Sequence, residues 1–146
     1  MKFDLEIVVE RPVDEVFGYV TAVENLPEWQ ESALEASWKD EPPITRGSRM
    51  WERRRFLGRT AENELEVTAY EPDRRFDLKI VKGPVRFEVR HAFEPSDGGT
   101  RLRVVVEGGG TMLRLAGPIV ARQAEQQFSA DLERLRDVLA RRGKPL

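Results

Sequence analysis

The last third of the chain carries its longest hydrophobic periodicity. Between Met112 and Arg142, apolar side chains recur at the spacing of one face of a helix that turns about 100° per residue. The positions on this face are Leu113, Val120, Ala124, Phe128, Leu132, Leu135 and Leu139. Charged and amide side chains fall mostly on the other faces. The pattern predicts one long amphipathic C-terminal helix.

The two ends of this helix are marked by glycine and proline. Gly143 can take a left-handed cap, and Pro145 prevents continuation beyond it. The start has two interpretations. Pro118 is either the first-turn proline of a helix that begins near Gly117, or a kink in a helix that begins at Met112.

The apolar face of the helix is unevenly filled. Its N-terminal half carries the small residues Gly117, Ala121 and Ala124, whereas its C-terminal half carries Phe128 and a run of leucines. Small residues on a buried face indicate either close backbone packing or the floor of a pocket. Truncating a buried side chain to alanine without collapse costs roughly 2–5 kcal/mol, a cost that a function would have to justify.

Upstream of residue 110 the pattern is that of strands joined by turns. Apolar residues alternate with polar ones from Phe3 to Val9, which predicts a half-buried strand. A short helix should open at Pro12, and a second should run from about Thr21 to Leu26 and end at Pro27. Six further strands are expected near 33–39, 48–57, 61–71, 75–82, 85–95 and 100–108. Residues 96–99, Ser-Asp-Gly-Gly, predict a hairpin turn, and the short connections argue for an antiparallel sheet with one covered face.

Composition narrows the class of protein. A chain of 146 residues is expected to form one domain spanning 1–146. Its 24 basic and 26 acidic residues are interspersed, which favours neither nucleic acid nor an anionic membrane as a partner. There is no cysteine, no aliphatic run long enough to span a bilayer and no apolar core of a signal peptide near the start. We therefore expect a cytoplasmic protein without membrane insertion.

Three segments and the closing helix together resemble a known family. The segments are Arg11–Phe17 (RPVDEVF), Glu24–Trp29 (ENLPEW) and Tyr70–Phe76 (YEPDRRF). In this order and spacing the chain resembles the polyketide cyclase/dehydrase branch of the START/Bet v 1-like (SRPBCC) superfamily, over almost its whole length. The resemblance implies an α+β helix-grip fold, in which a curved seven-stranded antiparallel sheet wraps around the C-terminal helix and two short helices follow the first strand. It also implies an elongated cavity between sheet and helix, which favours the pocket-floor interpretation of the small residues.

His91 is the first candidate for chemistry. It is the only histidine and the only polar residue in the inward-facing alternation from Val85 to Phe93. A desolvated imidazole there could act as an acid or base near neutral pH, or it could be a core histidine bonded to a backbone carbonyl. With no second histidine and no cysteine, we expect no metal site, and no cofactor is expected.

The segment from Arg49 to Phe56 offers two further candidates. Both of its faces are mixed, but the resemblance favours the one carrying Met50, Glu52, Arg54 and Phe56 as inward. Glu52 and Arg54 would then be charges inside the fold, paired with each other or holding a polar group of a ligand. The alternative is a solvated edge strand, for which four arginines are typical. Such an edge would resist edge-to-edge pairing, and we expect a monomer or a weak homodimer.

The remaining candidates would line the cavity. They are Trp29, Met50, Phe56, Val67, Phe76, Phe87, Gly117, Val120, Ala121, Ala124 and Phe128. Each could also be ordinary core. Gln123 and Gln127 flank the small residues and could reach a ligand or face water.

Three functions fit these residues. The first is a protein that binds a hydrophobic or aromatic small molecule, lipid or polyketide-like, between sheet and helix. The second is an enzyme of the polyketide cyclase/dehydrase type, with His91 or Glu52 moving a proton and Arg54 holding a carbonyl or carboxylate. The third is a regulatory or interaction protein whose cavity is closed by bulky side chains.

Overall fold

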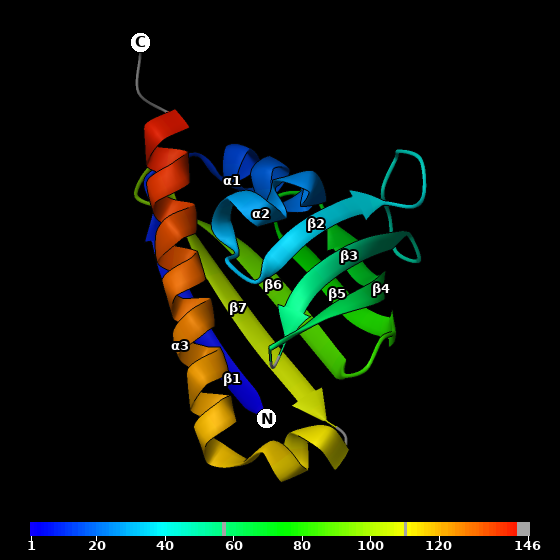
Figure 1. Ribbon diagram of the computed structural model, residues 1–146. Coiled ribbons are helices and arrows are strands. Elements are labelled where there is room, and N and C mark those ends of the chain that lie inside the picture. Colours follow the sequence, from blue (N-terminus) through cyan, green and yellow to red (C-terminus); the bar gives the residue numbers. More distant parts are fainter. Residues whose placement is uncertain (57, 110, 143–146) are drawn as a thin grey trace.

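Seven strands form one antiparallel sheet in the order β1-β7-β6-β5-β4-β3-β2. The structure is a computed structural model that describes residues 1–56, 58–109 and 111–142, with the side chains of all of these except 56 and 111–116. The strands are β1 (Lys2–Val9), β2 (Ala33–Trp38), β3 (Arg49–Phe56), β4 (Arg59–Glu71), β5 (Arg75–Lys82), β6 (Arg86–Ser96) and β7 (Gly99–Gly109). The sheet curls into a half-barrel, and the long helix α3 (Thr111–Arg142) runs along its open side (Figure 1). This is the expected helix-grip fold.

The strands form where apolar and polar side chains alternate, so that the apolar face of each strand is buried. In β1, Phe3 and Ile7 are buried and lie opposite Val106 and Leu102 of β7. The predicted hairpin turn joins β6 to β7 at Asp97 and Gly98, whose φ angles of 48° and 81° are the left-handed values that a tight two-residue turn requires.

Strand β3 is not an edge strand, so the edge-strand interpretation of its four arginines is wrong. The two edges of the sheet are β1 and β2, and β3 pairs on both sides, with β2 and β4. Because β3 is flanked on both sides, its charged residues do not guard a free edge, and the argument from them against edge-to-edge pairing does not apply.

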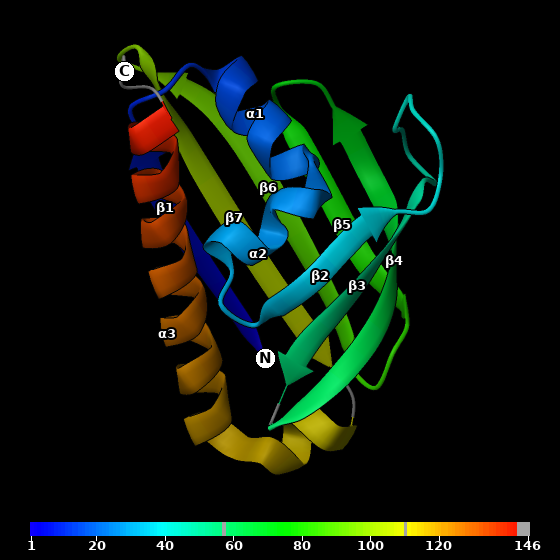
Figure 2. The ribbon, with the colours of Figure 1, turned by 45° about the horizontal axis from the view of Figure 1, so that its top comes forward.

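Two short helices and a 3-10 turn follow β1 and precede β2 in the chain, and they cover one end of the half-barrel (Figure 2). They are α1 (Val13–Thr21), η1 (Val23–Asn25) and α2 (Leu26–Trp29). The prediction that Pro27 ends a helix is wrong, because Pro27 lies in the first turn of α2. A first-turn proline lacks only an N–H that would have had no helical partner, so it starts this helix instead of stopping one.

Helix α3 combines the two interpretations of its start. It begins at Thr111, and Gly117 interrupts it with φ 77° and ψ −178°, after which Pro118 opens the longer second part. A positive φ of this size favours glycine, which explains a small residue at 117 through the backbone alone. The predicted cap at Gly143 and stop at Pro145 lie outside the described residues.

The second part of α3 closes the core at one end of the molecule. Leu132, Leu135 and Leu139 are buried there, as the periodicity predicted, and the helix contacts α2 as well as β1 and β7. Toward the kink the helix buries less, and Ile119 is 73% exposed. As far as the structure describes them, none of the helices is both long and apolar enough to cross a bilayer.

Candidate functional site

A cavity of about 330 Å³ lies between the middle of α3 and the concave face of the sheet. Its wall is mostly apolar and includes Phe3, Val85, Phe87, Val106, Val120 and Phe128. Arg55 and Gln123, both exposed, line it toward solvent, whereas the buried side chains of Glu52, Asn63 and Asp131 line it toward the interior. A smaller pocket of about 50 Å³ adjoins it and shares Glu52, Arg54 and Phe128 with it.

The sequence candidates are divided between these two spaces. The larger cavity is lined by Glu52, Arg54, Phe87, Val120, Ala124 and Phe128. The smaller pocket is lined by Trp29, Met50, Phe76 and His91.

Three further candidates lie outside both spaces. Val67 is core, 1% exposed, Gly117 is at the helix break, and Ala121 is half-buried beside the cavity wall. The side chain of Phe56 is outside the described set.

Strand β3 positions the polar residues by its alternation. Met50 and Glu52 are buried on the concave face, while Arg53 is exposed on the other face. Glu52 lies opposite Asn63 of β4 and Ala36 of β2 in the register. The inward face of β3 is therefore the one that the resemblance favoured.

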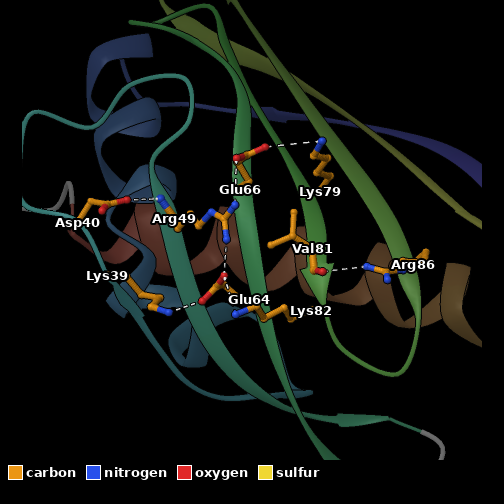
Figure 3. Close-up of polar contacts among 9 residues, drawn as sticks. All are labelled: Lys39, Asp40, Arg49, Glu64, Glu66, Lys79, Val81, Lys82 and Arg86. Atoms are coloured by element: carbon orange, nitrogen blue, oxygen red, sulfur yellow. Dashed lines mark hydrogen bonds and ion pairs between the residues drawn. The ribbon is translucent and has the colours of Figure 1, made fainter.

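The outward face of the same strands carries a separate network of ion pairs (Figure 3). Glu64 accepts hydrogen bonds from Lys39 and from Nη1 of Arg49 at 2.7 Å, and Lys82 lies 4.0 Å away. These hydrogen bonds and charges lower the pKa of Glu64 to about 2. The outward charges of β3 and β4 thus neutralise one another. They play no part in holding the inward pair, Glu52 and Arg54.

Glu52 and Arg54 form a fork-to-fork ion pair inside the fold. Arg54 donates from Nε and Nη2 to the two carboxylate oxygens of Glu52, at 3.0 and 2.9 Å. Asn63 donates to Glu52 at 2.8 Å, while Arg54 also donates to Ser32 and Gln30, each at 2.6 Å. Burial alone would raise the pKa of Glu52, but the charge and hydrogen bonds of Arg54 outweigh it, and the pKa is lowered. Glu52 is therefore an ionised carboxylate, held in place.

Asp131 of α3 is a second carboxyl group in the cavity wall. It is 1% exposed, and its Oδ1 accepts hydrogen bonds from the backbone N–H of Glu31 at 3.2 Å and from Gln127 at 2.9 Å. In the part of the chain that the structure describes, its Oδ2 accepts none. Burial raises the pKa of Asp131, against the opposing effects of its hydrogen bonds and of the charge on Arg54.

His91 is held by the backbone. Its Nδ1 lies 2.7 Å from the carbonyl oxygen of Phe76, so Nδ1 carries the proton and donates it there. The residue lines the smaller pocket. The ring stacks between Phe76 and Phe93 at centroid distances of 5.6 and 6.3 Å. Burial lowers the pKa of His91, which keeps the ring neutral. It has no hydrogen bond to Glu52 among the described residues.

Sequence reasoning missed Asp131 and Asn63, although both carried a signal. Asp131 follows Phe128 by three residues and precedes Leu135 by four, so it falls on the predicted dry face of α3. Asn63 shares the parity of Leu65, the first of the residues assigned to the apolar face of its strand. A lone polar residue on an apolar face was the available sign in each case.

The described residues contain no cluster of three or more histidine and acidic side chains that could hold a metal ion. The site itself is an apolar cavity with two buried carboxyl groups and one arginine in its wall.

Comparison with known proteins agrees with the fold. Residues 1–140 match the family described as polyketide cyclase / dehydrase and lipid transport, and the chain belongs to this family. Comparison of the sequence with curated proteins gives no match.

Solved structures with the same fold share little sequence with this chain. TTHA0849 from Thermus thermophilus has a TM-score of 0.81 at 16% identity, covering 99% of this chain and 100% of that one. The ZhuI aromatase/cyclase from Streptomyces sp. R1128 also has a TM-score of 0.81, at 14% identity, covering 99% and 96% of the two chains. A START superfamily protein from Mycobacterium smegmatis has a TM-score of 0.75 at 15% identity, with 94% and 98% covered. At these identities the likeness establishes the fold alone.

Proposed function

We propose that this protein binds one hydrophobic or aromatic small molecule, lipid or polyketide-like, in the cavity between α3 and the sheet. The observation that carries the proposal is the cavity itself, whose volume of about 330 Å³ is in the range of small-molecule sites. Its apolar wall suits the body of the ligand. The buried Glu52 and Asp131 and the half-buried Arg54 supply polar groups at one end that would fix its orientation. An open cavity supports this function over that of a regulatory protein whose cavity is filled.

Two alanines on α3 provide the test. Ala124 lines the cavity, whereas Ala121, one turn earlier, is half-buried and does not. Ala124→Leu would fill the cavity, and Ala121→Leu is the matched control with the same change on the same helix. The probe is prodan, a neutral naphthalene dye that brightens in apolar surroundings.

The expected result is bright prodan fluorescence with the wild type and the Ala121→Leu variant, and a loss of at least about tenfold in affinity with the Ala124→Leu variant. The melting temperature of each variant shows whether it is folded. Equal prodan affinity of a folded Ala124→Leu variant and the wild type would refute the binding site. Native mass spectrometry of the purified wild type would then show whether a small molecule accompanies it.

A second candidate is an enzyme of the cyclase/dehydrase type, and Asp131 is the observation in its favour. Asp131 is a buried carboxyl group with a raised pKa, and one of its oxygens has no hydrogen-bond partner among the residues that the structure describes, which suits an acid or base. In a dehydration it would take the proton next to the carbonyl and return it to the departing hydroxyl, so that a β-hydroxy ketone becomes an enone and water. Glu52 suits this role less because Arg54 binds both of its carboxylate oxygens, and His91 suits it less because it lines the smaller pocket and not the larger cavity.

The test of the enzyme is the appearance of enone absorbance from an aromatic β-hydroxy ketone. The wild type should accelerate the reaction, and Asp131→Asn should abolish the acceleration while prodan still binds. A wild type that binds prodan without accelerating the reaction would rule out this dehydration and leave the binding function standing.

A further inference from the structure

Glu52, Arg54 and Asp131 line the interior part of the cavity, and the charges of the first two cancel. Glu52 and Arg54 bind each other through two hydrogen bonds. A guanidinium has five N–H donors, and Arg54 commits four of them: two to Glu52, one to Ser32 and one to Gln30. At most one donor remains, whereas the bidentate grip on a carboxylate needs two. Arg54 is therefore not free to receive an acidic ligand.

Asp131 adds to the interior part of the cavity a carboxyl group that has no ion-pair partner among the described residues. Its Oδ1 is bound to Glu31 and Gln127, and its Oδ2 has no hydrogen-bond partner in the part of the chain that the structure describes. The side chain is 1% exposed and lines the cavity, so its carboxylate faces the ligand space and not bulk water. Arg134 lies nearby on α3, but it makes no hydrogen bond to Asp131 and does not line the cavity.

We propose that Asp131 makes the cavity selective by charge: it accepts a hydrogen bond from a neutral hydroxyl of the ligand and rejects a ligand that places a carboxylate there. This inference rests on the proposed binding function. Its physical basis is that two carboxylates in a poorly solvated space repel each other strongly, whereas a hydroxyl donor satisfies Oδ2. The ligand class is then a hydroxylated aromatic or alcohol, as opposed to a free fatty acid or aromatic acid.

The test uses two probes of one shape and two variants of one kind. 2-Naphthol and 2-naphthoate share the same ring system, and at about pH 8 the first is neutral and the second is an anion. Each is titrated against bound prodan to measure its affinity. Asp131→Asn keeps an oxygen for Glu31 and Gln127 and removes the charge. Asp137→Asn is the control, because Asp137 is an exposed aspartate on the same helix.

The readout is the ratio of the 2-naphthol affinity to the 2-naphthoate affinity. We expect this ratio to fall by about tenfold or more in Asp131→Asn, chiefly because 2-naphthoate binds more tightly, and to stay at the wild-type value in Asp137→Asn. An unchanged ratio in Asp131→Asn would overturn the inference, as would prodan binding that 2-naphthol fails to compete with. Failure of prodan to bind the wild type would instead refute the proposed function.

Discussion

Removing the charge of Glu52 should destabilise the fold more than any substitution of an exposed acid. In Glu52→Gln, one carboxylate oxygen becomes an amide N–H₂ group that meets the donors of Arg54 or Asn63. The side chains of Glu52 and Arg54 are only 5% and 17% exposed, so water can do little to replace the lost partner. Breaking such a buried pair from one side leaves an uncompensated charge and costs about 3–5 kcal/mol.

The lower end of that range applies here. Arg54 keeps its hydrogen bonds to Ser32 and Gln30 and has some access to the cavity, so we expect a loss of about 3 kcal/mol. At roughly 2–4 °C per kcal/mol for a domain of this size, the melting temperature should fall by about 6–12 °C. Denaturation in urea, followed by tryptophan fluorescence, measures the loss directly.

The pH dependence of the loss has a definite sign. The pKa of Glu52 is lowered from its ordinary value of 4.5, so its stabilisation is present above pH 4.5 and is lost as the pH falls through the lowered pKa. The gap between wild type and Glu52→Gln should therefore be full at pH 7 and narrow in acid. Adding Arg54→Met to Glu52→Gln should recover about half of the loss or more, because the double variant has no charge at either position and so leaves no buried charge without a partner.

The matched control for Arg54→Met is Arg53→Met, which removes an exposed arginine from the outer face of the same strand. Arg53 lies 3.5 Å from Glu35 in a solvated ion pair, and its loss should cost less than about 1 kcal/mol. A Glu52→Gln variant that loses under about 1 kcal/mol, or whose gap to the wild type is the same at pH 7 and pH 3, would refute the buried pair.

Three further substitutions test other parts of the site. Gly83→Ala should cost more than about 1 kcal/mol in urea denaturation, because its Cβ would lie 2.2 Å from Oδ1 of Asn63; a neutral effect would contradict this close approach. Asp131→Asn should be more stable than the wild type at pH 7. Since the pKa of Asp131 is raised, that gain should disappear as the pH falls below its ordinary value of 3.8, and a gain that persists in acid would have another cause. The pKa of His91 is lowered, so folding stability is lost as the pH falls below 6.5; His91→Phe should reduce this loss, and an equal loss in the variant would show that His91 is not the group responsible.

The fold could be predicted from the sequence because nearly every helix and strand has one face of buried apolar side chains. The strand expected at 61–71 is β4 (Arg59–Glu71), and the one expected at 75–82 is β5 (Arg75–Lys82). The prediction at Pro27 was wrong because proline occurs both after the end of a helix and in its first turn. What decided between the two was the preceding 3-10 turn and the burial of Trp29, which is tertiary information.

The site was less accessible to sequence reasoning, for two physical reasons. The two faces of β3 are equally mixed in charge, so its alternation could not say whether Glu52 or Arg53 faces inward. As a small residue on the helix, Gly117 predicts either close backbone packing or, as the resemblance favours, a pocket floor, yet its positive φ at the helix break already accounts for a glycine there. A small residue can be required by the local backbone conformation as readily as by a neighbouring cavity.

The buried polar residues differ in whether the protein alone satisfies them. His91 needs nothing from a ligand to explain its Nδ1–H, because the carbonyl of Phe76 accepts it and two aromatic rings enclose the imidazole. Asp131 is the opposite case: burial opposes its charge, one of its oxygens has no partner among the described residues, and an apolar residue would fill the same position on α3 at lower cost. A chain that keeps an unfavourable carboxylate in the wall of an apolar cavity gains nothing in stability from it. Under the proposed binding function, the hydrogen-bonding group that completes Asp131 comes from the ligand.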